Sequence, residues 1–298
     1  MAPVRRTMLA AGLATGLAGT SLLGAATVAS GVGPETLQER GRTVKIVDGD
    51  TVLVDVWGDG TRTPKSVRFT GVNANEIGQC HAAAATARTR GLALGHRTRL
   101  LGIDPASMSR MRLLRTVLVR RPDGSFKNRA RTLIVESRAT ASPKPLEWAH
   151  NREYRRLADA AAAGHRRIWN GRACGWGPQQ AAHIHVEVHP DAPGVDAQNL
   201  NGERVLVENR NKSATLRLGG WWVRDASPYR YVFPRGTSVP AGRTLVLRSG
   251  CGNRTALTHY WCSPVPRFLN ASFDERALGD GAYLVDRDGD IRRRHLYP

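Results

Sequence analysis

The chain has 298 residues, enough for two domains of ordinary size that each have a hydrophobic core. Its 44 lysines and arginines exceed its 25 aspartates and glutamates, and the formal net charge is +19. This excess favours association with polyanions but indicates no particular chemistry. Beyond the N-terminal segment no stretch is long and apolar enough to span a bilayer, which excludes a protein with several membrane helices.

Residues 1–29 have the features of a signal peptide. Arg5 and Arg6 precede an uncharged segment that is rich in Leu, Ala and Gly, and small residues follow up to Ala29 and Ser30. This pattern predicts cleavage near Ala29 or Ser30 and a secreted, extracellular protein without a membrane span after cleavage. An uncleaved N-terminal anchor is the alternative.

The next stretch, residues 44–76, is predicted to form strand, turn, strand, turn and strand. Asp48 and Asp50 flank a glycine in the first turn, Arg68 lies in the returning strand, and Glu76 follows that strand. Carboxylates and an arginine near one point suit a divalent cation and a phosphate. A charged hairpin with one solvated face is the alternative interpretation.

The following elements complete a first domain over residues 42–175. An alanine-rich segment predicts a helix at 80–94, and two strands are expected at 97–103 and 112–119. A further helix is expected at 126–138, and apolar residues at three- and four-residue steps predict another at 148–164.

Residues 171–180 contain Gly, Pro and Gln, and we place a linker between the domains at 176–181. Over residues 182–298 the sequence pattern is almost purely that of β-strands. Short strands separated by Gly and Pro turns indicate a β-sandwich. Residues 182–189 alternate His or Glu with apolar residues, which predicts an edge strand with one wet face; a metal site is the alternative. Asp286–Asp290 lacks the spacing of a calcium loop and is predicted to be a hairpin turn.

Four cysteines are consistent with export to an oxidising compartment, and they allow three pairings. Pairs within each predicted domain close loops of ordinary size, which favours Cys80–Cys174 and Cys251–Cys262. A cysteine metal site is the alternative, but no Cys-x-x-Cys spacing occurs.

Two families resemble the two halves. Asp48-Gly49-Asp50-Thr51-Val52, the strand with Arg68 that ends in Val72-x-x-x-Glu76, and a second arginine strand from Arg112 to a Pro122-Asp123-Gly124 turn resemble the staphylococcal nuclease (thermonuclease-like) family. The resemblance spans about residues 43–169. It implies a mainly β fold with helices, a five-stranded OB-type barrel, and a nuclease that hydrolyses phosphodiesters.

The nuclease resemblance also implies roles for particular residues. Asp50 would be the metal carboxylate, and Asp48 would lie next to it without binding the metal directly. The backbone carbonyl of Ala74 would be a further ligand of the divalent cation, which is calcium in this family. Glu76 would be the general base, and Arg68 and Arg112 would hold the phosphate.

This sequence departs from the nuclease pattern at several positions. Asn73 stands where the family has a second metal aspartate, so the site has one ligand charge fewer. Asn75 replaces the usual proline, and Arg110 stands where an aromatic residue is common.

The second half resembles the lamin-tail domain, an immunoglobulin-like sandwich. The segments that carry this resemblance are Asn199–Val205, Leu218–Trp221, Phe233-Pro234 and Pro240–Gly242. Bacterial lamin-tail domains commonly accompany secreted nucleases and hydrolases.

Two functions remain open from the sequence. One is a secreted metal-dependent nuclease that acts on DNA or RNA and docks through its lamin-tail domain on a cell-envelope polymer or protein. The other is a catalytically weakened or inactive protein that binds nucleic acid or an anionic envelope polymer.

Overall fold

In the first half of the chain, β-branched and apolar residues recur at every second position, and these segments form strands that pair in a ring. The computed structural model describes residues 34–171, 173–174, 183–226, 229–268 and 280–297. The ring strands are β1 (Leu37–Ile46), β2 (Thr51–Val56), β3 (Lys65–Phe69), β5 (Arg97–Gly102) and β7 (Arg112–Arg120). β1 pairs with β2 and β5, β2 with β3, and β5 with β7, all antiparallel. A parallel β3–β7 pairing closes the ring.

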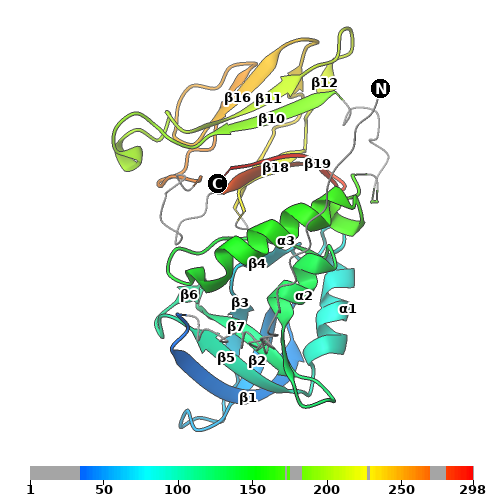
Figure 1. Ribbon diagram of the computed structural model, residues 1–298. Coiled ribbons are helices and arrows are strands. Elements are labelled where there is room, and N and C mark those ends of the chain that lie inside the picture. The colour runs from blue at the N-terminus through cyan, green and yellow to red at the C-terminus, as the bar shows by residue number, and fades with distance from the viewer. Residues whose placement is uncertain (1–33, 172, 175–182, 227–228, 269–279, 298) are drawn as a thin grey trace, which may run out of the picture. The chain divides into compact units, whose positions relative to one another are not determined.

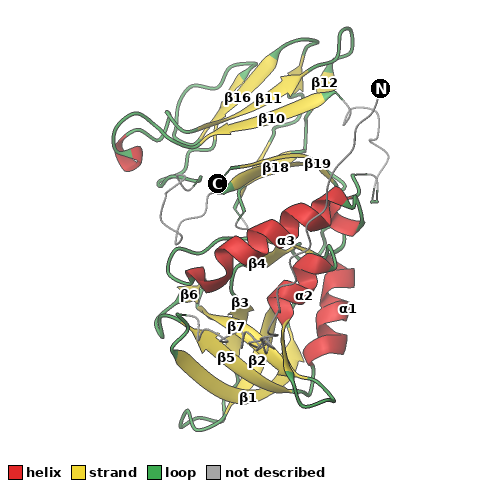
Figure 2. Ribbon diagram, viewed as in Figure 1, coloured by secondary structure: helices red, strands yellow, loops and turns green. Residues whose placement is uncertain are grey.

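Helices lie beside the ring, as Figures 1 and 2 show. They are α1 (Ala82–Ala93), α2 (Arg129–Val135) and α3 (Asn151–Ala163), with single 3-10 turns at Trp148–His150 and Arg167–Trp169. Short strands complete this half: β4 (Val72–Ala74) with β9 (Ala139–Ala141), and β6 (Met108–Ser109) and β8 (Phe126–Asn128), which both pair with β7. Apolar side chains of the ring strands, α1, α2 and α3 form one buried core that includes Val52, Phe69, Leu133 and Tyr154.

The second half is built from two four-stranded sheets, with order β10-β11-β16-β17 and β14-β13-β18-β19, and from a β12–β15 pair. The bounds are β10 (Ile184–His189), β11 (Arg204–Asn209), β12 (Leu216–Arg217), β13 (Trp222–Arg224), β14 (Arg230–Val232), β15 (Ser238–Val239), β16 (Thr244–Arg248), β17 (Thr258–Tyr260), β18 (Gly281–Val285) and β19 (Ile291–Leu296). A 3-10 turn lies at Asp196–Gln198. Both sheets contribute side chains to a shared core, among them Val207, Leu245 and Leu284.

A third apolar cluster joins elements from the two halves. Ala161 and Ala162 of α3 and the residues Ile168 and Trp169 pack with residues of β13, β18 and β19, including Tyr283. The rings of Trp169 and Tyr283 lie 6.4 Å apart. These contacts join the two halves in one compact unit.

Several expectations from the sequence hold in the structure. The pattern of His and Glu in β10 gives strict alternation of buried and half-buried residues, and β10 is the edge strand of its sheet. Asp286–Asp290 is the turn of the β18–β19 hairpin. Both favoured disulfides, Cys80–Cys174 and Cys251–Cys262, are formed.

Other expectations were wrong in detail. The helix expected at 126–138 is a short strand followed by a shorter helix, because Phe126–Asn128 extends the sheet beside β7 and the Asn128 side chain caps the first turn of α2. β1 begins at Leu37, well before the expected residue 44, since its first half pairs with β5. β19 was not expected, because three consecutive arginines hide its alternation.

Two regions named from the sequence lie outside the described residues. These are the signal peptide at 1–29 and the linker at 176–181. None of the described helices is long and apolar enough to cross a membrane.

Candidate functional site

The turn between β1 and β2 brings the first two carboxylates into position. The carboxylate of Asp48 accepts a hydrogen bond from the backbone N–H of Asp50 (2.9 Å), which orders the turn. The hydroxyl of Thr89 in α1 donates to the carbonyl of Gly49 (2.6 Å), and this hydrogen bond holds the turn against the helix. A Cβ atom at Gly49 would lie 2.7 Å from that of Ala74, so glycine is required by the close packing.

Asp50 lies at the centre of the site and is 1% exposed. Its Oδ1 accepts hydrogen bonds from Nη1 of Arg68 (2.9 Å) and from the hydroxyl of Thr51 (3.2 Å). Its Oδ2 accepts one from the backbone N–H of Ala74 (2.7 Å). Both oxygens of this carboxylate therefore have protein partners.

Arg68 links Asp50 to Asn73. Its second guanidinium nitrogen, Nη2, donates to Oδ1 of Asn73 (2.8 Å), and the arginine is 2% exposed. The guanidinium thus lies between the aspartate and the asparagine. In this arrangement the arginine that was expected to hold a phosphate is buried in an ion pair.

Burial sets the protonation of Asp50. Desolvation raises the pKa of this carboxyl to about 6, against the lowering effect of Arg68. The negative charges of Asp48 and Glu76 add to the rise, and the Ala74 N–H opposes it. Glu76 is therefore close enough to Asp50 for its negative charge to raise the pKa of Asp50.

Asn73 and Ala74 are held by the β4–β9 pairing, in which Asn73 lies opposite Thr140. The hydroxyl of Thr140 donates to the backbone carbonyl of Asn73 (3.2 Å) and accepts a weak hydrogen bond from Nη2 of Arg224 (3.4 Å). Arg224, a buried residue of β13, is therefore connected to Asn73 through two hydrogen bonds that share the Thr140 hydroxyl.

Arg112 reaches the same place from β7. Its Nη1 donates to the hydroxyl of Thr51 (3.2 Å), the residue that also bonds Asp50, and its Nε donates to the carbonyl of Ser109 (3.3 Å). Unlike Arg68, Arg112 is half-buried. Its side chain remains partly open to solvent.

Glu76 faces a cavity of about 490 Å³. The backbone N–H of Glu76 donates to Oε1 of Gln79 (3.1 Å), and Glu76 is half-buried. Arg110, Arg230 and Arg287 line the same cavity, and all three are exposed. The cavity therefore combines two carboxylates, Glu76 of the expected site and Asp288, with three cations that the motif did not include.

The donors do not fit a calcium ion as they are arranged. Calcium requires several free oxygens directed at one point. Here the Arg68 guanidinium takes one oxygen of Asp50 and the side-chain oxygen of Asn73. Calcium binding by Asp50, Asn73, the Ala74 carbonyl and Asp48 stays a prediction, and it requires Arg68 to leave both oxygens.

Sequence reasoning missed two basic residues beside the site. Burial lowers the pKa of Lys144, and the charge of Arg68 lowers it further, whereas Asp280, Asp225 and Asp50 oppose the shift. Burial likewise lowers the pKa of Arg224. Neither residue lies in a motif, and no local signal in the sequence could have placed either near Asp50.

The second half of the chain is the part that matches a known protein family. It has two sheets around a common core, and its hairpin β18–β19 and strand β13 face the first half. The family model of the lamin tail domain matches residues 179–298. This segment is a lamin tail domain.

The lamin tail domain takes part in the candidate site. It contributes Arg230 and Arg287 to the cavity that Glu76 faces, and Arg224 to the hydrogen bonds behind Asn73. No curated protein matches the chain.

Proposed function

We propose that this chain is an exported protein that binds single strands of nucleic acid, and that the Asp50–Arg68–Asn73 network stabilises the barrel instead of holding a catalytic metal ion. The observation that carries the proposal is the cavity lined by Arg110, Arg230 and Arg287. These three guanidinium groups are exposed and make no ion pair with another described residue. Their N–H groups can donate to phosphates, although Arg110 and Arg230 also lie 5.2 Å from the ring centres of Tyr229 and Trp222.

An aromatic side chain beside the cavity supports a single-stranded ligand. Tyr229 is 46% exposed, and the guanidinium groups of Arg110 and Arg267 lie 5.2 and 4.4 Å from its ring centre. Arginines along a strand's backbone and an exposed ring on which a base stacks are the two elements of single-strand binding. Both are present within one region of the surface.

The fold also supports this class of ligand. The closed strand order β1-β2-β3-β7-β5 supports the OB-type barrel predicted from the sequence, and OB folds commonly bind oligonucleotides. The formal net charge of +19 adds a long-range attraction to any polyanion.

The test is a fluorescence-anisotropy titration of the full chain with labelled single-stranded DNA and RNA at several salt concentrations. The triple variant Arg110→Ala, Arg230→Ala and Arg287→Ala should bind more weakly, and its plot of log K against log salt should be less steep by about 2. The matched control replaces three exposed arginines outside the cavity, Arg62, Arg217 and Arg235, which removes the same charge. Equal losses in both variants would contradict the cavity as the binding site.

A metal-dependent nuclease is the second candidate, and one observation favours it. Asp50, Arg68, Glu76 and Arg112 come from separate strands and loops, yet hydrogen bonds and charge interactions bring them together. Incubating a plasmid with the protein, with calcium or with chelator, separates the candidates. Our proposal predicts no cleavage in either case and none for Asn73→Asp, with binding retained. Calcium-dependent cleavage that Glu76→Ala abolishes would establish the nuclease.

A further inference from the structure

The disulfide between Cys80 and Cys174 lies within a cluster of metal-ligand side chains. One donor atom each from Cys80, His81, Cys174 and Asp290 can be chosen so that all four lie within 4.8 Å of one another. In a tetrahedral zinc site with bonds of about 2.0–2.3 Å, the ligand atoms are separated by roughly 3.3–3.8 Å. The four donors therefore lie close enough together for one zinc ion to bind them all once the two bonded sulfur atoms separate.

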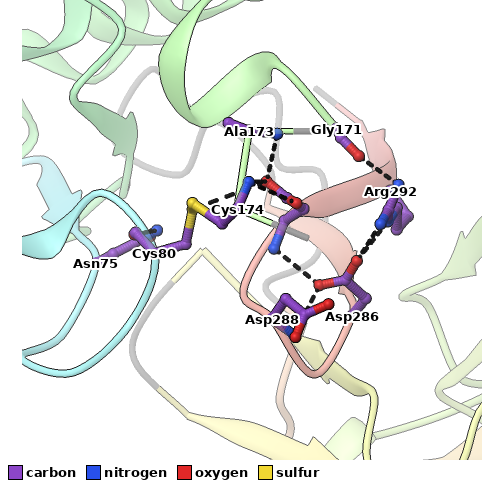
Figure 3. Close-up of a disulfide and its surroundings, with 9 residues drawn as sticks. Asn75, Cys80, Gly171, Ala173, Cys174, Asp286, Asp288 and Arg292 are labelled. Carbon is purple, nitrogen blue, oxygen red and sulfur yellow. Dashed lines mark hydrogen bonds and ion pairs between the residues drawn. A yellow bond between two sulfur atoms is a disulfide. The ribbon is translucent and has the colours of Figure 1, made fainter. Parts of the chain in front are cut away.

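The four residues come from three distant parts of the chain. Cys80 and His81 precede α1, Cys174 follows the last 3-10 turn of the first half, and Asp290 ends the β18–β19 turn of the lamin tail domain. Figure 3 shows the loop of Cys80, the segment of Cys174 and the turn with Asp286 and Asp288 meeting at the disulfide. Gly289 permits this approach, since a Cβ atom there would lie 2.8 Å from that of Cys80.

His81 has a nitrogen available for a ligand. Its Nε2 is buried and has no hydrogen-bond partner among the described residues.

Asp290 is held in place by its surroundings. Its carboxylate accepts hydrogen bonds from the backbone N–H groups of Ala173 (3.1 Å) and Cys174 (3.0 Å), and its Oδ1 lies 3.7 Å from Sγ of Cys80. Arg292 braces the turn, because it bonds both Asp286 and the carbonyl of Gly171, as Figure 3 shows.

We propose that Cys80, His81, Cys174 and Asp290 bind a zinc-class divalent cation when the Cys80–Cys174 disulfide is reduced. A phosphine reductant and one water convert the disulfide into two thiols and the phosphine into its oxide. Binding of the cation then releases the two thiol protons and gives two thiolate ligands. Imidazole and carboxylate complete a four-coordinate set of the kind that zinc takes. Formation of the disulfide removes both thiolates and excludes the metal.

The test uses Co²⁺ as a spectroscopic probe with the full chain in a phosphine reductant. The reduced protein should bind one Co²⁺ with the visible bands of a tetrahedral site and a sulfur-to-cobalt charge-transfer band, and Zn²⁺ should displace it. The oxidised protein should give neither band. His81→Ala should weaken binding at least tenfold, because loss of even an outer partner of a zinc site typically costs about 10–100-fold.

The chain contains its own control in the second disulfide, Cys251–Cys262, which belongs to no such donor cluster among the described residues. Cys251→Ser with Cys262→Ser should leave the cobalt spectrum unchanged, whereas Cys80→Ser with Cys174→Ser should abolish it. Reduction could also unfold the protein, and near-ultraviolet circular dichroism detects this. In that event, addition of the metal should restore the native spectrum. A reduced protein that shows no cobalt bands, or unfolds and is not restored by metal, would overturn the proposal.

Discussion

At the scale of single residues, the unusual group is Asp50, a carboxyl that is buried against an arginine. Arg68 and the Ala74 N–H stabilise the charged form, but burial outweighs them and raises the pKa to about 6. A buried ion pair of this kind contributes less to stability than its short distances suggest, because both charges lose their hydration.

The raised pKa predicts a pH dependence of folding. The unfolded carboxyl has a pKa of 3.8 and the folded one about 6, so the folded state holds the proton more tightly. The contribution of Asp50 to the free energy of unfolding is therefore greatest below about pH 4 and is lost as the pH rises through 6. The loss amounts to about 3 kcal/mol at most, since one pKa unit is worth about 1.4 kcal/mol.

Urea unfolding of the wild type and of Asp50→Asn at pH 4, 5, 6 and 7 checks this. The amide cannot titrate, so the wild type should lose stability relative to the variant as the pH rises. Any constant offset from the altered hydrogen bond to Arg68 cancels in the slope. A relative gain with rising pH would mean that Arg68 outweighs burial.

At the scale of elements, the β1–β2 turn depends on close packing against α1 and β4. Gly49 has Ala74 on one side and Ala85 on the other, and a Cβ atom would lie 2.7 and 2.9 Å from their Cβ atoms. The hydrogen bond from Thr89 to the Gly49 carbonyl holds the helix at this distance. The position of both carboxylates therefore rests on one glycine.

Gly49→Ala should destabilise the protein by about 1–3 kcal/mol, because the methyl group overpacks a buried contact. Gly91 in α1 is the matched control. A Cβ atom there meets nothing within 4 Å, and its φ lies outside the left-handed region. Gly91→Ala should stabilise the helix by roughly 0.5–1 kcal/mol. Thermal unfolding measures both changes, and equal effects of the two substitutions would contradict the packing argument.

At the scale of the whole molecule, the two halves share apolar packing as well as the polar contacts at Asp290. Trp169 is 7% exposed and packs near Tyr283 of the lamin tail domain, with the Arg294 guanidinium 4.6 Å from its ring. The boundary at 176–181 separates two sequence patterns, but the two halves of the chain pack against each other.

We therefore expect the two halves to unfold in one transition, followed by tryptophan fluorescence and by far-ultraviolet circular dichroism. Trp169→Ala should cost about 3–5 kcal/mol and separate the two signals, because it removes a buried aromatic contact between the halves. Trp57, which is 50% exposed, is the control, and Trp57→Ala should change stability by much less. Two well-separated transitions in the wild type would show instead that the halves fold independently.

The sequence by itself determined the local elements and the chemistry that lies within them. Alternation predicted β10, alanine content predicted α1, and the Asp-Gly-Asp spacing predicted the turn that presents Asp50. These features depend on neighbouring residues, whose periods of two and 3.6 are visible in a line of text. Domain reasoning predicted the cysteine pairs for the same reason, since each pair lies within one pattern.

The tertiary structure alone decided which groups meet at the site. The sequence names Arg68 and Asn73, but it does not show that one guanidinium takes an oxygen from each of Asp50 and Asn73. Lys144, Arg224 and Asp290 reach their positions through contacts with residues far away in the chain. Such contacts arise from packing of whole sheets and helices, which local periodicity does not encode. Burial, which sets the charge of Asp50, is likewise a property of the assembled fold.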